Sequence, residues 1–242
     1  MLSALVLVAC RHPEPGPVPA DLPPVHGAPE TEPLALRHLE VAAAGQSNLE
    51  GYRNGLPGFP VPPGSRWFDH GEPRDAFGAG AGVNGVHHGP EAAFLQELAA
   101  HGVTSSLVKH GEPGSAIAQW LDTEADALIA EAAVARVAPE VLIWMQGEAD
   151  AGSPATVRAY PERLEAVTDR FREAWGEELL IVVIGTRVDP ADPRWSAEIL
   201  ADQQAWVEAD GRSVLVDIAD AGVQPDFHLT GTSPGCDPVS YT

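Results

Sequence analysis

The stretch Val41–Tyr52, VAAAGQSNLEGY, joins a short apolar run to a polar turn. The apolar run stops at Gly45, and an amide, a hydroxyl and a second amide follow at Gln46, Ser47 and Asn48. Glycine, serine and asparagine favour turns, so a strand that ends in an ordinary turn is one interpretation. The other interpretation is a nucleophilic serine held at the carboxyl end of a strand. The rest of the chain has to decide between the two.

Five short apolar runs after Leu34 predict a parallel α/β fold. Each run is apolar throughout rather than alternating, as expected for strands buried on both faces of a sheet. Right-handed crossovers between such strands give a three-layer α/β/α architecture with a five-stranded parallel sheet. The runs are Leu39–Ala43, Thr104–Lys109, Val141–Met145, Leu179–Ile184 and Ser213–Ile218.

Four segments between these runs predict helices. Residues 90–102 open with proline and end near a glycine, the usual order at helix ends, and we expect His101 to cap this helix. Residues 122–137 begin with acidic side chains, which favour a helix start. Residues 160–175 and 195–210 repeat apolar side chains at helical spacing.

Polar residues follow four of the five predicted strands, and this distribution favours an active site. In open parallel sheets, ligands bind at the carboxyl ends of the strands. The polar groups are Gly45–Asn48, His110–Ser115, Gln146–Glu148 and the late loop that carries Asp226 and His228. The pattern strengthens the interpretation of Ser47 as a nucleophile.

A serine nucleophile needs a base, an orienting acid and donors for the oxyanion. Only His228 follows the last predicted strand, two residues after an acid. The α/β-hydrolase elbow has a second glycine two residues after the serine, whereas this chain has Leu49 there, which disfavours that fold.

Several blocks of the sequence resemble SGNH-type hydrolases of the sialate O-acetylesterase-like branch, which includes carbohydrate esterase family 6. The blocks are AAGQSNLEGY, HHGPEAAFLQELA, SSLVKHGEPGSAIAQW, VLIWMQGEADA and DFHLTG, in that order along the chain. They extend from about Val41 to Gly231. The first and fourth blocks are the specific ones. The resemblance implies a flavodoxin-like SGNH fold and a serine esterase that removes O-acetyl groups from carbohydrate.

The resemblance also implies site residues. Ser47 would be the nucleophile and His228 the general base. The backbone N–H of Ser47 would be one oxyanion donor, with Gly114 as the second and Gly111 as its alternative, because Pro113 has no N–H.

The side-chain amide of Gln146 would be the third donor, and such donors typically contribute about 3 kcal/mol each. Gln46, Asn48 and Glu148 would support the site, and Glu148 and Asp150 would hold the Gln146 loop by accepting hydrogen bonds.

Two departures from the family pattern leave alternatives open. The family acid usually lies three residues before the histidine, where this chain has Pro225. We expect Asp226 to orient His228, with Asp220 and Asp217 as alternatives. The end of the chain, TSPGCDPVSYT, is too short and too rich in helix breakers for the helix that the family has there, so this C-terminal helix is expected to be missing. A surface-tethered glycan-binding module that has lost catalysis is the alternative function.

Composition limits the partners and suggests a location. The 242 residues carry 35 acidic and 14 basic side chains, a net charge of −21, which argues against nucleic-acid binding. Residues 1–10 end in Leu-Val-Ala-Cys and resemble a bacterial lipoprotein signal, with Cys10 as the lipidated residue and the membrane contact. Residues 11–33 are rich in proline and predict an extended tether. We therefore expect an extracytoplasmic, membrane-anchored esterase domain over residues 34–242.

Metal binding is disfavoured at two histidine-containing stretches. His87 and His88 are adjacent, so their side chains point in different directions, and no third ligand has helical spacing to them. The stretch Asp69–Glu72 is discounted in the same way. We expect neither a metal nor another cofactor, and the sequence leaves the oligomeric state open.

Overall fold

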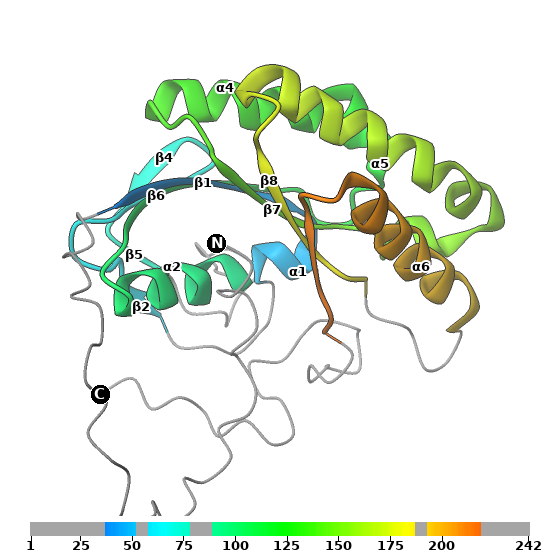
Figure 1. Cartoon of the computed structure of the whole chain (residues 1–242), viewed down its shortest axis with the longest axis horizontal. Coiled ribbons are helices and arrows are strands. Elements are labelled where there is room, and N and C mark those ends of the chain that lie inside the picture. The colour runs from blue at the N-terminus through cyan, green and yellow to red at the C-terminus, as the bar shows by residue number, and fades with distance from the viewer. Residues whose placement is uncertain (1–36, 52–57, 78–88, 187–192, 219–242) are drawn as a thin grey trace, which may run out of the picture.

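The computed structural model describes residues 37–51, 58–77, 89–186 and 193–218, and they form a three-layer α/β/α fold (Figure 1). The main sheet has seven strands in the order β4-β3-β6-β1-β7-β8-β9. These strands are β1 His38–Gly45, β3 Arg66–Asp69, β4 Glu72–Arg74, β6 Thr104–Gly111, β7 Val141–Met145, β8 Leu180–Ile184 and β9 Val214–Val216. Phe59–Pro60 (β2) and Ala76–Phe77 (β5) form a separate two-stranded sheet.

The predicted fold class is confirmed, but the predicted number of strands is wrong. All five predicted strands form, and they pair in parallel as β6-β1-β7-β8-β9. The structure adds β3, parallel to β6, and β4, antiparallel to β3. Both additions are short and carry charged side chains, and β4 lies at the edge of the sheet, so neither forms the continuous apolar run that marks a buried strand.

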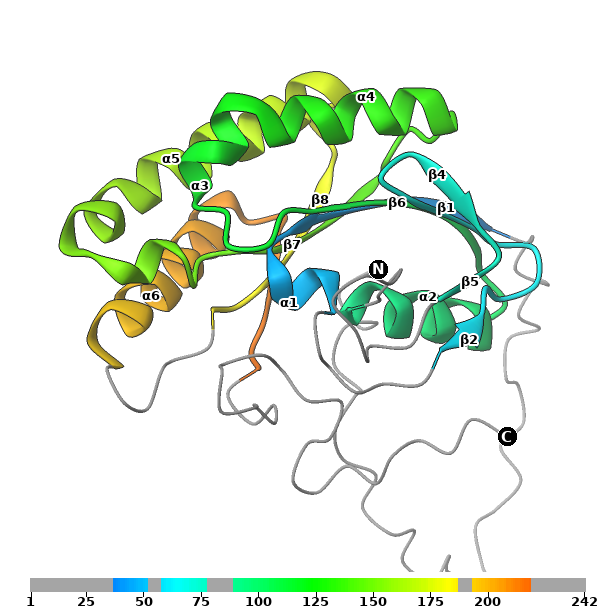
Figure 2. The ribbon, with the colours of Figure 1, turned by 180° about the vertical axis from the view of Figure 1, so that it is seen from behind.

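Two apolar clusters lie on opposite faces of the sheet. In β1, Ala42 and Ala44 face one cluster while Val41 and Ala43 face the other, because side chains alternate along a strand. The first cluster includes residues of α4 Ala125–Ala135, α5 Pro154–Trp175 and α6 Pro193–Asp210. The second includes residues of α1 Ser47–Glu50 and α2 Pro90–Ala100. Figure 2 shows α4 and α5 on one side of the sheet and α1 and α2 on the other.

The predicted helices form with small differences at their ends. His101 is the C-cap of α2, as expected. A short helix, α3 Ile117–Gln119, and a π-helical turn, η1 Trp120–Glu124, precede α4, so the regular helix begins later than predicted. A 3₁₀ turn, η2 Asp150–Gly152, precedes α5, which begins at Pro154 with Ser153 as its N-cap, earlier than predicted. In the described part of the chain, no helix has the length and apolarity that crossing a membrane requires.

Several sequence-based expectations concern residues outside the described ranges. These are the signal-like segment with Cys10, the proline-rich tether, His228 with Asp226 and Asp220, and the C-terminal helix. They stay predictions.

Candidate active site

The candidate nucleophile, Ser47, is the first residue of α1 and lies two residues beyond the end of β1. Position 45 has no room for a side chain, because a Cβ atom there would lie 2.1 Å from the carbonyl oxygen of Met145 at the end of β7. The backbone N–H of Gln46 donates to that same oxygen at 3.1 Å. The end of β1 is therefore pressed against the end of β7, and the half-buried Ser47 follows at once.

Three polar loops begin side by side at the carboxyl ends of neighbouring strands. The parallel register places Gly45 opposite Gly111 of β6 and opposite Met145 of β7. The backbone N–H of Glu112 donates to the Gly45 carbonyl at 3.0 Å. The segments that begin at Gln46, Glu112 and Gln146 thus start side by side, as the sequence pattern predicts.

The turn after β6 distinguishes the two glycines that were considered as oxyanion donors. Gly114 is exposed, has a φ of 77°, and has no heavy atom within 4 Å of the position of a Cβ. Gly111 is buried, and a Cβ there would lie 2.2 Å from Oε1 of Glu50. The open position of Gly114 favours it over Gly111 as the residue whose N–H faces a ligand.

Gln146 lies in a network of hydrogen bonds and is almost fully buried, with 1% of its surface exposed. Its side-chain Nε2 donates to Oδ2 of Asp150 at 2.6 Å and to the carbonyl oxygen of Ser115 at 3.1 Å. Both partners only accept, so together they fix the orientation of the amide. Its Oε1 has no hydrogen-bond partner among the described residues. Both amide hydrogens are therefore engaged, and the predicted role as third oxyanion donor requires one of these bonds to be exchanged.

Asp150 joins the loops that follow β6 and β7. Besides the Gln146 amide, its Oδ2 accepts the backbone N–H of Ile117 at 2.8 Å. Burial raises the pKa of Asp150, although the hydrogen bonds from Gln146 and Ile117 oppose that rise. Thr156 also donates to the Asp150 carbonyl oxygen. The carboxylate holds the Gln146 loop in the way that the sequence predicts.

The three predicted supporting residues link the β1 and β7 loops. Asn48 Nδ2 donates to Oε1 of Glu148 at 2.9 Å. Gln46 is buried, and its Oε1 lies 3.4 Å from the backbone nitrogen of Ala149, which donates to it. Gln46 and Asn48 of the loop after β1 thus each form a hydrogen bond with a residue of the loop after β7. Their catalytic relevance stays a prediction.

Sequence reasoning missed part of the network around Gln146. The backbone carbonyl of Gln146 accepts hydrogen bonds from Gln203 Nε2 at 2.8 Å, Tyr160 Oη at 3.1 Å and Thr186 Oγ1 at 3.3 Å. Gln203 is fully buried on the apolar face of α6. A glutamine within an otherwise apolar helical stripe is the signal that points to such a role.

The candidate acids and bases are only partly described. Asp217 is exposed and directly follows β9. Asp226, Asp220 and His228 lie outside the described residues, so the predicted Ser47–His228–Asp226 set stays a prediction.

A second group of polar side chains lies near α1, and it bears on the expected absence of a metal. His87 and His88 lie outside the described ranges. His70, in the other discounted stretch, has a ring nitrogen within 4.8 Å of ligand atoms of His110 and Glu131. The sequence disfavoured a metal at this stretch because no further ligand is suitably spaced along the chain. The structure brings in partners from β6 and α4, which are distant from His70 in the sequence.

Three comparisons place this geometry among known proteins. Residues 41–234 match the family model described as a carbohydrate esterase, sialic acid-specific acetylesterase. No curated protein matches the chain.

Among solved structures, a carbohydrate acetylesterase from Xanthomonas citri is 21% identical with a TM-score of 0.58, and the match covers 79% of this chain and 52% of that one. A protein from Arabidopsis thaliana is 14% identical with a TM-score of 0.64, over 79% and 91% of the two chains. A family 3 carbohydrate esterase from Clostridium thermocellum is 14% identical with a TM-score of 0.52, over 80% and 88%. The chain thus spans about half the length of the Xanthomonas protein, and these likenesses concern the fold.

Proposed function

The chain belongs to the carbohydrate esterase family of sialic acid-specific acetylesterases, as the sequence resemblance predicts, and from this we propose that it hydrolyses O-acetyl esters of carbohydrate with Ser47 as nucleophile. The observation that carries the proposal is the position of Ser47. It is the first residue of α1, directly after β1. The Gly114 turn and Gln146 follow β6 and β7, the two strands that flank β1, at the same end of the sheet.

The proposed reaction has two steps. Ser47 Oγ attacks the carbonyl carbon of the acetyl group while its proton passes to His228. The bond between the acetyl carbon and the sugar oxygen then breaks, the sugar oxygen takes the proton, and the acetyl group stays on Ser47. A water molecule, deprotonated by His228, attacks the acetyl carbon. The bond from that carbon to Ser47 Oγ then breaks, Oγ recovers its proton from His228, and acetate leaves.

Two backbone groups are suited to the negative charge that develops on the carbonyl oxygen. The N–H of Ser47 belongs to the first turn of α1, where backbone donors have no partner within the helix. The N–H of Gly114 belongs to an open turn. The buried side chain of Gln146 supports the site by joining the β6 and β7 loops through hydrogen bonds to Ser115 and Asp150.

The test is acetate release by the full chain from 4-nitrophenyl acetate, acetylated xylan, an O-acetylated sialic acid and acetylated peptidoglycan fragments. We expect turnover of at least one carbohydrate ester and its loss in Ser47→Ala. Ser213→Ala is the matched control, because Ser213 precedes β9 at the opposite end of the strands and hydrogen-bonds to Asp210. Binding of a sugar without turnover, unchanged in Ser47→Ala, would instead favour a glycan-binding module.

A further inference from the structure

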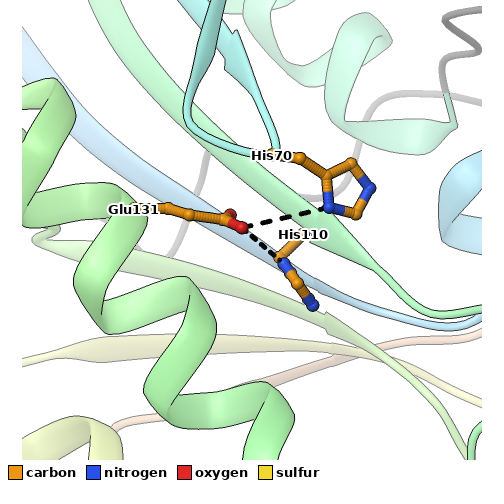
Figure 3. Close-up of side chains that lie close together, drawn as sticks. All are labelled: His70, His110 and Glu131. Atoms are coloured by element: carbon orange, nitrogen blue, oxygen red, sulfur yellow. Dashed lines mark hydrogen bonds and ion pairs between the residues drawn. The ribbon is translucent and has the colours of Figure 1, made fainter.

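A cluster of two histidines and two glutamates lies near α1, where His70 pairs with Glu50, and we call it the His70 cluster. Figure 3 draws three of its members, His70, His110 and Glu131. It consists of His70 from the turn between β3 and β4, His110 from β6, Glu131 from α4 and Glu124 from η1. His110 Nδ1 lies 3.0 Å from Oε1 of Glu131, and His70 Nδ1 lies 4.0 Å from that same oxygen. Two histidines, one from the β3–β4 turn and one from β6, thus converge on one carboxylate oxygen of α4.

The spacing of these atoms suits a small metal ion. A tetrahedral zinc ion binds nitrogen and oxygen ligands at about 2.0–2.1 Å, which places neighbouring ligand atoms about 3.3 Å apart. The two measured distances to Glu131 lie on either side of that value, and the three ligand atoms all lie within 4.8 Å of one another. Small side-chain movements would therefore bring the set to coordination distance.

The other ring nitrogen of His110 is already held as a metal ligand requires. His110 Nε2 lies 3.0 Å from Oε2 of Glu124. A histidine that binds a metal through one nitrogen usually donates the hydrogen of the other to a carboxylate or carbonyl group, which fixes the tautomer. With Nε2–H donated to Glu124, the lone pair of Nδ1 points to the side of Glu131 and His70.

Carboxylate oxygens near the cluster have lone pairs without partners. Buried oxygens of Glu131 and Asp69, namely Oε2 and Oδ1, have no hydrogen-bond partner among the described residues, and Oε1 of Glu50 lies 3.5 Å from Nε2 of His70. Lys109 is fully buried and forms ion pairs with Glu91 and Glu50 on the other face of β6, so its charge is shared there. The region has more carboxylates than cations, which favours a bound cation.

The backbone at His70 is unusual. His70 has a φ of 50° and the next residue, Gly71, has a φ of 76°, as in a type I′ hairpin turn. Asparagine and glycine are the usual residues at the first of these positions, and a histidine in the left-handed region is uncommon. A Cβ at Gly71 would lie 3.3 Å from Cγ of Glu131, so the turn packs directly against α4.

We propose that His70, His110 and Glu131 bind one divalent transition-metal ion of the zinc type, that Glu124 orients His110, and that the ion fixes the β3–β4 turn to α4. Two imidazoles and one carboxylate suit zinc, whereas magnesium and calcium prefer oxygen ligands throughout. Three protein ligands leave a fourth position for water. The alternative is an imidazolium of His110 held between Glu124 and Glu131 without a metal.

The test measures zinc binding by the full chain after chelator treatment, by equilibrium dialysis and by the zinc-dependent change in melting temperature. We expect one zinc ion whose binding is lost in His70→Asn and in Glu131→Gln. Asparagine tolerates the left-handed backbone, and glutamine keeps the size of glutamate, so both variants should fold. Glu124→Gln should weaken binding by about tenfold to hundredfold, as expected for a group in the second layer.

His101→Asn is the matched control. It replaces a histidine that also pairs with a glutamate, Glu97, but on an exposed helix surface outside the His70 cluster. It should bind zinc like the wild type. A Co²⁺-loaded protein should show a visible absorption band that His70→Asn lacks. No zinc-dependent change in melting temperature of the wild type would overturn the proposal. Stoichiometric zinc binding that persists in both His70→Asn and Glu131→Gln would also overturn it, because the metal would then lie elsewhere in the chain.

Discussion

The side-chain nitrogen of Gln146 lies 2.6 Å from Oδ2 of Asp150, and the same carboxylate oxygen accepts the backbone N–H of Ile117 at 2.8 Å. This one buried side chain therefore fixes the loops that follow two neighbouring strands of the sheet. The pH dependence of stability tests its environment.

Asp150→Asn should change how stability depends on pH. Burial raises the pKa of Asp150 in the folded state, so the folded protein binds this proton more tightly than the unfolded chain does. The contribution of Asp150 to stability is fully present below its ordinary pKa and is lost as the pH rises through the raised pKa. The free energy of unfolding of the wild type, measured relative to Asp150→Asn by urea denaturation, should fall as the pH rises above about 4, the ordinary pKa of an aspartate. A difference that grows over this range would contradict the assignment.

Gly45→Ala should destabilise the protein and disturb Ser47. The new Cβ would lie 2.1 Å from the Met145 carbonyl oxygen, and since this is a backbone atom, the strands must shift. We expect a loss of about 1–3 kcal/mol or more in the free energy of unfolding, measured in urea. Gly152→Ala is the control: no heavy atom lies within 4 Å of its Cβ position, and stability should change by less than about 0.5 kcal/mol.

Glu148 should support catalysis by holding Asn48 in place rather than through its negative charge. Its Oε1 accepts the amide hydrogen of Asn48, which follows Ser47 directly. Glu148→Gln keeps an accepting oxygen, whereas Glu148→Ala removes it. Esterase activity, as kcat/KM, should fall by about tenfold to hundredfold in Glu148→Ala and stay near the wild-type value in Glu148→Gln. Equal losses in both variants would show that the negative charge matters instead.

The acid that orients His228 is tested by three substitutions. Asp226→Asn should lower turnover by up to about 10⁴ while leaving the fold intact, because a triad acid fixes the tautomer and stabilises the imidazolium. Asp217, which is exposed after β9, and Asp220 are the alternatives. Near-normal activity of Asp226→Asn, together with loss in Asp217→Asn or Asp220→Asn, would reassign the acid without affecting Ser47.

The sequence predicted what depends on local pattern. The apolar run before Gly45 indicated β1, and the polar residues that follow strands indicated where Ser47 and Gln146 lie. It did not predict β3, because Arg66–Asp69 is short and has a charged residue on each side of Trp67 and Phe68, so it forms no continuous apolar run. The hydrogen bonds of the Gln146 amide and the convergence of His70 with Glu131 depend on contacts between distant segments, which spacing along the chain does not show.

Covalent labelling tests directly whether Ser47 is the nucleophile. The full chain is treated with a serine-directed organophosphonate, and the modified peptide is identified by mass spectrometry alongside residual esterase activity. We expect one label per chain on the peptide that contains Ser47, loss of activity in parallel with labelling, and no label on Ser47→Ala. Hydrolysis of 4-nitrophenyl acetate by Ser47→Ala at the wild-type rate, or labelling that leaves Ser47 unmodified while activity is lost, would contradict it.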